Sequence, residues 1–88
     1  MKQPTVKILK ALANPTRLGL VRQLAACPEG KSCDDLSAKF YLSQPTMSHH
    51  FIKLVEAEVV VEGKAGTQKS YVLNRQLLKK HGISVNKL

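Results

Sequence analysis

The sequence predicts a mainly α-helical chain with a β-hairpin near its carboxyl end, and three observations support this fold class. Apolar residues recur at helical spacing in short segments between residues 5 and 57. These segments follow residues that commonly cap helices: Thr5, Asn14, Ser32 and Ser43. After Glu58 the pattern changes, because residues 59–61 are all valine and Gly63 and Gly66 flank a turn before strand-like composition resumes.

Size and charge restrict the classes of protein to which the chain can belong. We expect its 88 residues to form one domain, and a hydrophobic content of 43% is ordinary for a globular protein. The formal net charge is +8, and residues 1–43 and 44–88 each hold seven basic and three acidic residues. An evenly basic domain favours a polyanionic partner, nucleic acid before membrane, although a soluble protein can also simply be basic.

The cysteine content and the apolar pattern indicate a compartment. The chain has two cysteines, no signal-like apolar run at its amino end and no apolar segment near the length of about 18 residues that a membrane helix needs. These features are typical of a soluble protein in a reducing environment. We therefore expect a cytoplasmic location and no membrane partner.

The first predicted helix is short. Thr5 is expected to cap it, and the chain should leave it before Asn14, because the residue ahead of a proline avoids helical angles. Its apolar residues recur at helical spacing and are expected to face the core: Val6, Leu9, Leu12 and Ala13.

The second predicted helix begins at Pro15, with Asn14 as its cap. The residues expected to form its buried stripe are Leu18, Val21, Leu24 and Ala25. Gly19 costs about 1 kcal/mol relative to alanine inside a helix. It marks either close packing on a neighbouring helix or a tolerated weakness.

A third helix is predicted from Cys33 to Phe40, with Ser32 as its cap. Acidic residues 34 and 35 lie in its first turn, where the helix dipole favours negative charge. Residues 41–43 then form a connection of three residues to the next helix, which is the length that a helix-turn-helix requires. The predicted helix-turn-helix spans residues 32–57.

The fourth helix, predicted over residues 44–57, has one apolar and one polar side. At about 100° per residue, its apolar residues fall within a sector of roughly 100°, as a core-facing stripe should; they are Met47, Phe51, Leu54 and Val55. The other positions near its amino end carry hydrogen-bonding side chains of modest length, and a lysine follows: Gln44, Thr46, Ser48, His49 and Lys53. These side chains suit contact with DNA base edges and phosphates, so this helix is predicted to enter the major groove.

The hairpin is predicted over residues 59–73. Its tip, residues 64–69, is polar and basic and contains no acid, which favours contact with phosphate; the expected contact residues are Lys64, Thr67 and Lys69. A solvated hairpin with no partner is the alternative. Asn74 is expected to cap a last short helix that ends near Gly82.

Three segments in this order resemble the ArsR family of bacterial winged helix-turn-helix repressors, and the similarity covers most of the chain. They are Ala11-Leu12-Ala13-Asn14-Pro15-Thr16-Arg17-Leu18 before the second helix, Leu42-Ser43-Gln44-Pro45-Thr46-Met47-Ser48-His49-His50-Phe51 at the fourth helix, and Gly63-Lys64-Ala65-Gly66-Thr67-Gln68-Lys69-Ser70-Tyr71-Val72-Leu73 at the hairpin. The resemblance implies a homodimer whose paired recognition helices enter successive major grooves of double-stranded DNA. It also implies that a ligand or metal releases the DNA, and that the hairpin is the wing.

Several positions depart from the family pattern. Pro45 stands where many members have a small hydroxyl residue, and Glu58 stands where a glycine commonly ends the recognition helix. Founding members place a Cys-x-Cys pair at the start of the third helix, where this chain has Ser32-Cys33-Asp34-Asp35. The only candidate zinc ligand in the last helix is His81. We therefore expect no metal site and no cofactor, and the inducer is unknown.

Other chemistry is poorly supported. Cys27 and Cys33 are too far apart in sequence for a Cys-x-x-Cys site, although a metal- or thiol-responsive repressor that uses either one is an alternative. The adjacent His49 and His50 point about 100° apart on a helix, so they cannot share a metal; His49 suits a DNA contact, and His50 is expected to pack or to bond a carbonyl. No nucleophile with a base and no paired carboxylates are visible, so we expect no enzyme. A winged helix that binds another protein is the main alternative function.

Overall fold

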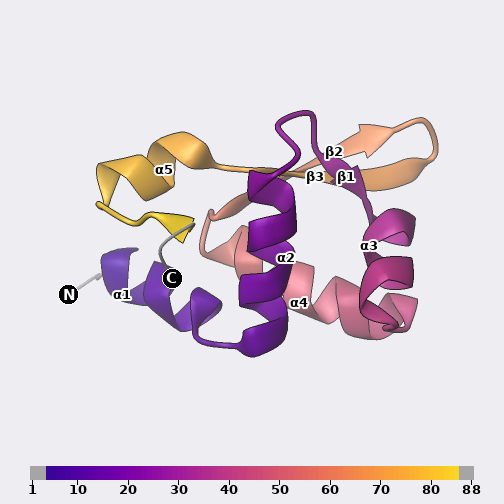
Figure 1. Cartoon of the computed structure of the whole chain (residues 1–88), viewed down its shortest axis with the longest axis horizontal. Coiled ribbons are helices and arrows are strands. Elements are labelled where there is room, and N and C mark those ends of the chain that lie inside the picture. Colours follow the sequence, from indigo (N-terminus) through magenta and orange to yellow (C-terminus); the bar gives the residue numbers. More distant parts are fainter. Residues whose placement is uncertain (1–3, 86–88) are drawn as a thin grey trace.

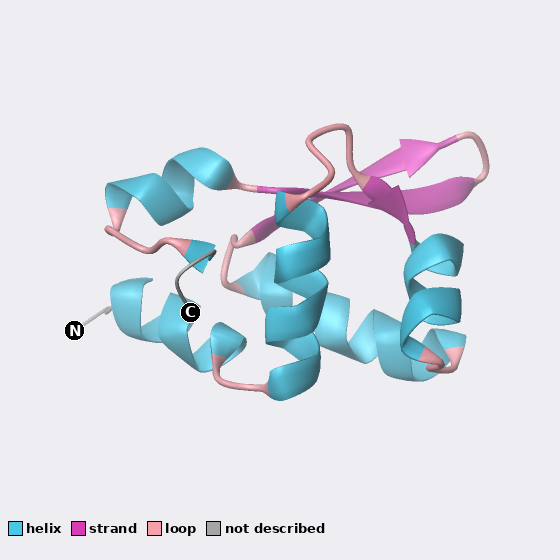
Figure 2. Ribbon diagram, viewed as in Figure 1, coloured by secondary structure: helices cyan, strands magenta, loops and turns pink. Residues whose placement is uncertain are grey.

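The computed structural model describes residues 4–85, apart from the side chains of Cys33, Asp34 and Ala65. The described residues form five helices and three strands in the order α1 (Pro4–Leu12), α2 (Pro15–Ala25), β1 (Lys31–Ser32), α3 (Cys33–Phe40), α4 (Gln44–Glu56), β2 (Val60–Ala65), β3 (Gln68–Leu73) and α5 (Arg75–Lys80). The molecule measures 36 × 24 × 23 Å, with α1 and α5 at one end and the hairpin tip at the other (Figure 1). Helices dominate beside one small sheet, which confirms the predicted fold class (Figure 2).

The sheet has three antiparallel strands in the order β1-β3-β2. The β2-β3 hairpin runs from the Val60–Leu73 pair to the Ala65–Gln68 pair, and Gly66 opens its two-residue turn with a φ of 68°. Strand β1 was not predicted; it pairs its two residues with Tyr71 and Ser70 of β3. Gly30 permits this approach, because a Cβ there would lie 2.9 Å from the carbonyl oxygen of Tyr71.

Capping side chains determine where most helices begin, as the sequence predicts. The side-chain oxygen of Asn14 accepts from the N–H groups of Thr16 and Arg17 at 2.9 and 3.1 Å. Ser32 and Ser43 cap α3 and α4 in the same way through their hydroxyl oxygens. Each side chain satisfies a backbone donor that the helix itself leaves unpaired.

Helix α5 is fixed at both of its ends. Asn74 caps it by accepting from the N–H of Leu77 at 3.3 Å, as predicted. The Arg75 guanidinium donates to the carbonyl oxygen of Ala25 at 2.7 Å, which joins the start of α5 to the end of α2. The predicted cap Thr5 instead lies inside α1, because α1 already begins at Pro4.

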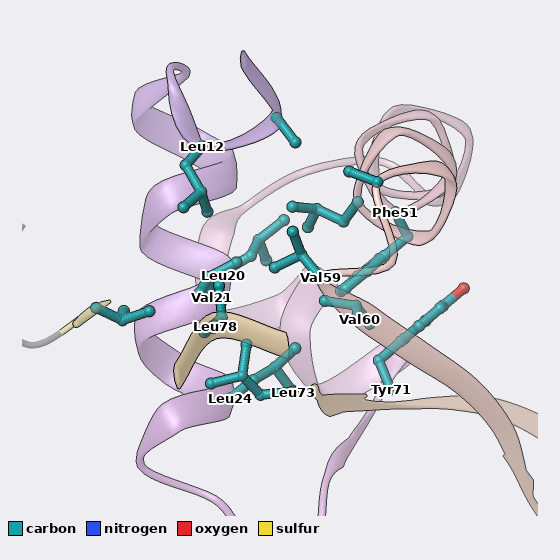
Figure 3. Close-up of a cluster of buried hydrophobic side chains, with 14 of the residues drawn as sticks. Leu12, Leu20, Val21, Leu24, Phe51, Val59, Val60, Tyr71, Leu73 and Leu78 are labelled. Carbon is teal, nitrogen blue, oxygen red and sulfur yellow. The ribbon is translucent and has the colours of Figure 1, made fainter. Parts of the chain in front are cut away.

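The core lies between the helices and one face of the sheet (Figure 3). Its fully buried side chains come from four of the helices and from the start of the hairpin: Phe51, Ile8, Leu20, Leu24, Leu36, Met47, Leu54, Val21, Val59 and Val60. Gly19 lets α2 approach α3 closely, because a Cβ there would lie 3.0 Å from the ring of Phe40. The glycine therefore marks close helix packing, the first of the two interpretations offered by the sequence.

The predicted inward face of α1 is wrong. Ile8, Ala11 and Leu12 are buried, whereas Val6 and Leu9 are 43% and 47% exposed and Ala13 is exposed too. The helix is apolar on two sides, and its periodicity cannot tell which side meets the rest of the chain. A smaller correction applies to α2, where Leu20 is buried and Leu18 is only half-buried.

Helix α4 ends in a left-handed residue without glycine. Glu58 has a φ of 63°, its N–H donates to Val55 at 2.9 Å, and the N–H of Val59 donates to Leu54 at 3.1 Å. This pair of bonds is the Schellman arrangement, which satisfies the last carbonyls of a helix. Glu58 thus ends α4 as a glycine would, at the cost of steric crowding around its Cβ.

Replacing Glu58 by glycine is expected to raise the free energy of unfolding by about 0.5 to 1 kcal/mol, because it removes the left-handed penalty of roughly 1 to 2 kcal/mol and adds a smaller entropic cost in the unfolded chain. Urea denaturation at constant m-value measures the change. Glu56→Gly in the last helical turn is the control, and it should destabilise. A loss of stability in Glu58→Gly as large as in the control contradicts the explanation.

Candidate nucleic-acid interface

Helices α3 and α4 form the helix-turn-helix. Tyr41 ends α3 in the left-handed conformation, with a φ of 54°, and the N–H of Leu42 donates to the carbonyl oxygen of Ser37 at 3.1 Å. The connection is three residues long, as predicted, and α4 begins at Gln44. The turn places the amino end of α4 at the surface, at the end of the molecule away from α1 (Figure 1).

The two sides of α4 have the predicted polarity. Met47, Phe51 and Leu54 are buried in the core, and Val55 is half-buried. The exposed residues are Gln44, Thr46, His49 and Lys53, and Ser48 is half-buried. Exposed polar side chains therefore continue over nearly three turns of a helix whose other side is fixed by the core.

The first turn of α4 orients one of these side chains. The Ser43 hydroxyl donates to the Thr46 hydroxyl oxygen at 2.9 Å, and the same Ser43 oxygen accepts from the Thr46 N–H at 3.4 Å. Thr46 therefore keeps its own hydroxyl proton free to donate to an acceptor outside the chain. Thymine O4 and the N7 and O6 atoms of guanine are acceptors of this kind in the major groove.

The two histidines of α4 have different surroundings. His49 is exposed, whereas His50 is half-buried, and the two rings meet edge to face with centroids 6.2 Å apart. Burial lowers the pKa of His50, and the charges of Arg17 and His49 lower it further. His50 is therefore neutral at pH 7 and a poor partner for phosphate. The interpretation that it packs is supported, since its Nδ1 is buried without a hydrogen-bond partner in the described part of the chain.

The wing carries the three predicted phosphate contacts at its surface. Lys64 and Lys69 stand opposite each other in the hairpin register, Thr67 lies in the turn, and all three are exposed. Lys69 also forms an ion pair with Glu62, with 3.3 Å between its Nζ and the carboxylate oxygen. Such an exposed pair is worth about 0 to 1 kcal/mol, but it offsets part of the charge of Lys69.

Ser48 and Lys69 line the same hollow between α4 and the wing. The hollow has a volume of about 210 Å³, and its other walls are Phe51, Ile52, Val55, Glu56, Glu62 and Tyr71. Ser48 thus lies on the flank of α4 nearest the hairpin. Lys64 and Thr67 lie farther along the wing, at and beside its tip.

Sequence reasoning missed a second group of basic residues. A cleft of about 360 Å³ lies between α1, α2 and α4 and is lined by Lys7, Lys10, Ala11, Arg17, Lys53, Glu56 and Ala57. Of its cations only Lys53 was predicted to contact DNA. The available signal was the spacing of Lys7 and Lys10, because residues three apart share one side of a helix.

Other candidate chemistry is limited to what the described residues show. Cys27 is half-buried and forms no disulfide, and the side chain of Cys33 lies outside the described part. A search of the described residues finds no group of three or more His, Cys, Asp or Glu placed to hold a metal ion. Over the same residues no helix combines the length and apolarity that a membrane span requires.

Comparisons with known proteins agree with this geometry. Residues 12–62 match the family model described as a helix-turn-helix domain. The arsenical resistance operon repressor of Staphylococcus xylosus is 44% identical over 71 residues, which are 81% of this chain and 66% of that protein. The transcriptional repressor SdpR of Bacillus subtilis is 31% identical over 71 residues, 81% of this chain and 77% of that protein.

The fold itself is known from solved structures. A homodimeric winged helix-turn-helix DNA-binding domain from Mycobacterium bovis, a possible ArsR-family regulator, superposes with a TM-score of 0.78 at 20% identity and covers 90% of this chain and 72% of that one. The chain therefore has the winged helix-turn-helix fold, as predicted. With the sequence matches above, it belongs to the ArsR family of helix-turn-helix transcriptional regulators. Membership in a family of regulators also confirms the expectation that the protein is not an enzyme.

Proposed function

We propose that this chain is a sequence-specific transcriptional repressor that binds double-stranded DNA, with α4 in the major groove and the wing on the backbone. The observation that carries the proposal is the polar side of α4, where Gln44, Thr46 and His49 are exposed opposite a buried stripe. Direct contact with base edges requires donors and acceptors of this length on a helix held rigidly by its other side. The net charge of +8 supplies attraction to phosphate.

Repression is the part of the proposal that rests on relatives. The similar proteins from Staphylococcus xylosus and Bacillus subtilis are named repressors, and this chain spans 66% of the length of the first. In this proposal residues 1–88 act as one domain, with the helix-turn-helix at 32–57 and the wing at 59–73. The repressor works in the cytoplasm on chromosomal DNA, and its inducer is not assigned.

The proposed repressor is a homodimer, and α1 supports this. Val6 and Leu9 are 43% and 47% exposed, and with Ala13 they form an apolar stripe on the side of α1 turned away from the core. An exposed apolar stripe on a small domain marks an interaction site. A second copy suits it, because a twofold axis brings the same stripe of each protomer together. The homodimeric structure from Mycobacterium bovis has the same fold.

The homodimer is expected to cover two half-sites about 10 to 10.5 base pairs apart, or a multiple of that spacing, in an imperfect palindrome, because two helices related by a twofold axis must meet one face of the duplex. Selection from a random DNA pool gives the site, and sedimentation gives the mass free and on DNA. Leu9→Glu should weaken the dimer and its binding. Val61→Glu is the control, because Val61 is a similarly exposed valine on the sheet.

A monomer both free and on DNA would overturn the homodimer while leaving DNA binding intact. A pool that shows no enrichment, with no binding to any duplex, would instead favour the protein-binding winged helix. The two results are distinguishable, because sedimentation does not depend on the DNA assay.

A further inference from the structure

The basic cleft between α1, α2 and α4 is the strongest feature that the proposed function leaves unused. Four of its seven lining residues are cations: Lys7, Lys10, Arg17 and Lys53. Glu56 is the single acid in its wall. The three lysines are exposed and Arg17 is half-buried, so the cleft presents a concentrated positive surface of about 360 Å³ to solvent.

These cations are not neutralised within the described part of the chain. No described carboxylate lies within 4.0 Å of the ammonium group of Lys7, Lys10 or Lys53, whereas Lys69 on the wing has Glu62 at 3.3 Å. Arg17 is held in place, since its Nε donates to the carbonyl oxygen of Ala11 at 2.6 Å. That bond uses one of the five guanidinium N–H groups. The cleft therefore holds one fixed cation and three mobile ones.

The position of the cleft connects it with the exposed side of α4. Lys53 and Glu56 belong both to α4 and to the cleft, and α1 lies at the end of the molecule opposite the wing tip (Figure 1). The long axis is 36 Å, which is close to one turn of B-DNA at about 34 to 36 Å. One duplex along α4 can thus pass the wing at one end of the protein and the cleft at the other.

We propose that this cleft binds phosphate groups of the DNA backbone on the side of α4 opposite the wing, with Lys7 and Lys10 of α1 as the main contacts. The inference rests on the proposed DNA binding and extends it to a third element. Lysine acts as a point charge on a flexible stem, so two lysines on an open helix surface suit a continuous phosphodiester chain. Free phosphate presents the same oxygens and is the competing source.

The test compares Lys7→Gln/Lys10→Gln with the control Lys79→Gln/Lys80→Gln, which removes the same two charges from α5. All four side chains are exposed, and circular dichroism checks that both doubles stay folded. Affinity is measured at several salt concentrations on the selected site and on a random duplex. The cleft double should lower the slope of log affinity against log salt by about 0.9 for each phosphate lost, or about 1.8 per protomer, on both duplexes. The control should keep most of the slope.

Two further measurements locate the contact. Ethylated phosphates that block the wild type beyond the wing contacts should no longer interfere with Lys7→Gln/Lys10→Gln. Glu56→Gln should bind both duplexes more tightly, because it removes the acid from the cleft. Inorganic phosphate at matched ionic strength should not displace DNA from the wild type more than chloride does.

Each outcome separates the two proposals. A wild type that binds no duplex overturns the proposed function itself. A wild type that binds DNA while both doubles lose the same slope, or while the ethylation pattern of the cleft double is unchanged, overturns only the backbone contact. Displacement by inorganic phosphate that the cleft double abolishes assigns the site to a free anion instead.

Discussion

Replacing Phe51 by alanine is expected to lower the free energy of unfolding by about 3 to 5 kcal/mol, because truncating a buried aromatic residue leaves a cavity that the core cannot fill. Phe51 is 1% exposed, and its ring stacks on that of Tyr71 with centroids 3.7 Å apart and planes 2° apart (Figure 3). The stack joins α4 to β3. At roughly 0.05 to 0.15 kcal/mol per residue, the whole chain should be stable by only about 4 to 13 kcal/mol.

Urea denaturation followed by circular dichroism measures this change. Phe51→Leu keeps most of the apolar contact and should cost less than half as much. Ile52→Ala is the matched control, because the neighbouring Ile52 is 55% exposed and should change stability by no more than about 0.5 kcal/mol. If Phe51→Ala costs no more than Ile52→Ala, the stack does not hold α4 on the sheet.

Helix boundaries could be predicted because they depend on residues next to each other in sequence. Asn14-Pro15 and Ser43 with Pro45 fix a cap and a first turn within three residues, and the structure has α2 and α4 begin where the sequence places them. Strand β1 was missed for the opposite reason. Its two residues carry no periodic pattern, and its partners on β3 lie about forty residues away.

The orientation of α1 could not be settled from sequence. Val6, Leu9 and Ala13 have the spacing of a core-facing stripe, but Ile8 and Ala11 fill the core in their place. Both sides are apolar, so the choice depends on which side fits against α2 and α4. The exposed stripe is then available to a second copy, which is why a wrong prediction about the core supports the proposed dimer.

The candidate site divides along the same line. The polar side of α4 follows from helical periodicity alone, and the structure exposes Gln44, Thr46 and His49 as expected. The pairing of Glu62 with Lys69 and the convergence of α1 on Lys53 depend on the tertiary fold. Charge counts along the sequence show neither, because they give no information on which cations share a surface.

The last prediction distinguishes residues that determine sequence preference from residues that contact phosphate. Replacing Gln44 or His49 by alanine is expected to cost about 1 to 3 kcal/mol on the specific site and to flatten base preference, with little effect on nonspecific duplexes, because both lie on the exposed side of the recognition helix. Replacing Lys64 should weaken all sequences about equally and lower the salt slope by about 1. Binding at several salt concentrations separates these two classes.

Lys69 provides the internal comparison, because its ion pair with Glu62 already offsets part of its charge. Lys69→Ala is expected to lower the salt slope less than Lys64→Ala, whereas Glu62→Gln should free Lys69 and raise the slope. Lys53 is expected to behave like the wing lysines, because it lines the basic cleft as well as α4. A wing mutant that alters sequence preference while keeping the wild-type salt slope would reverse the assignment, and α4 would then lie along the backbone with the wing in the groove.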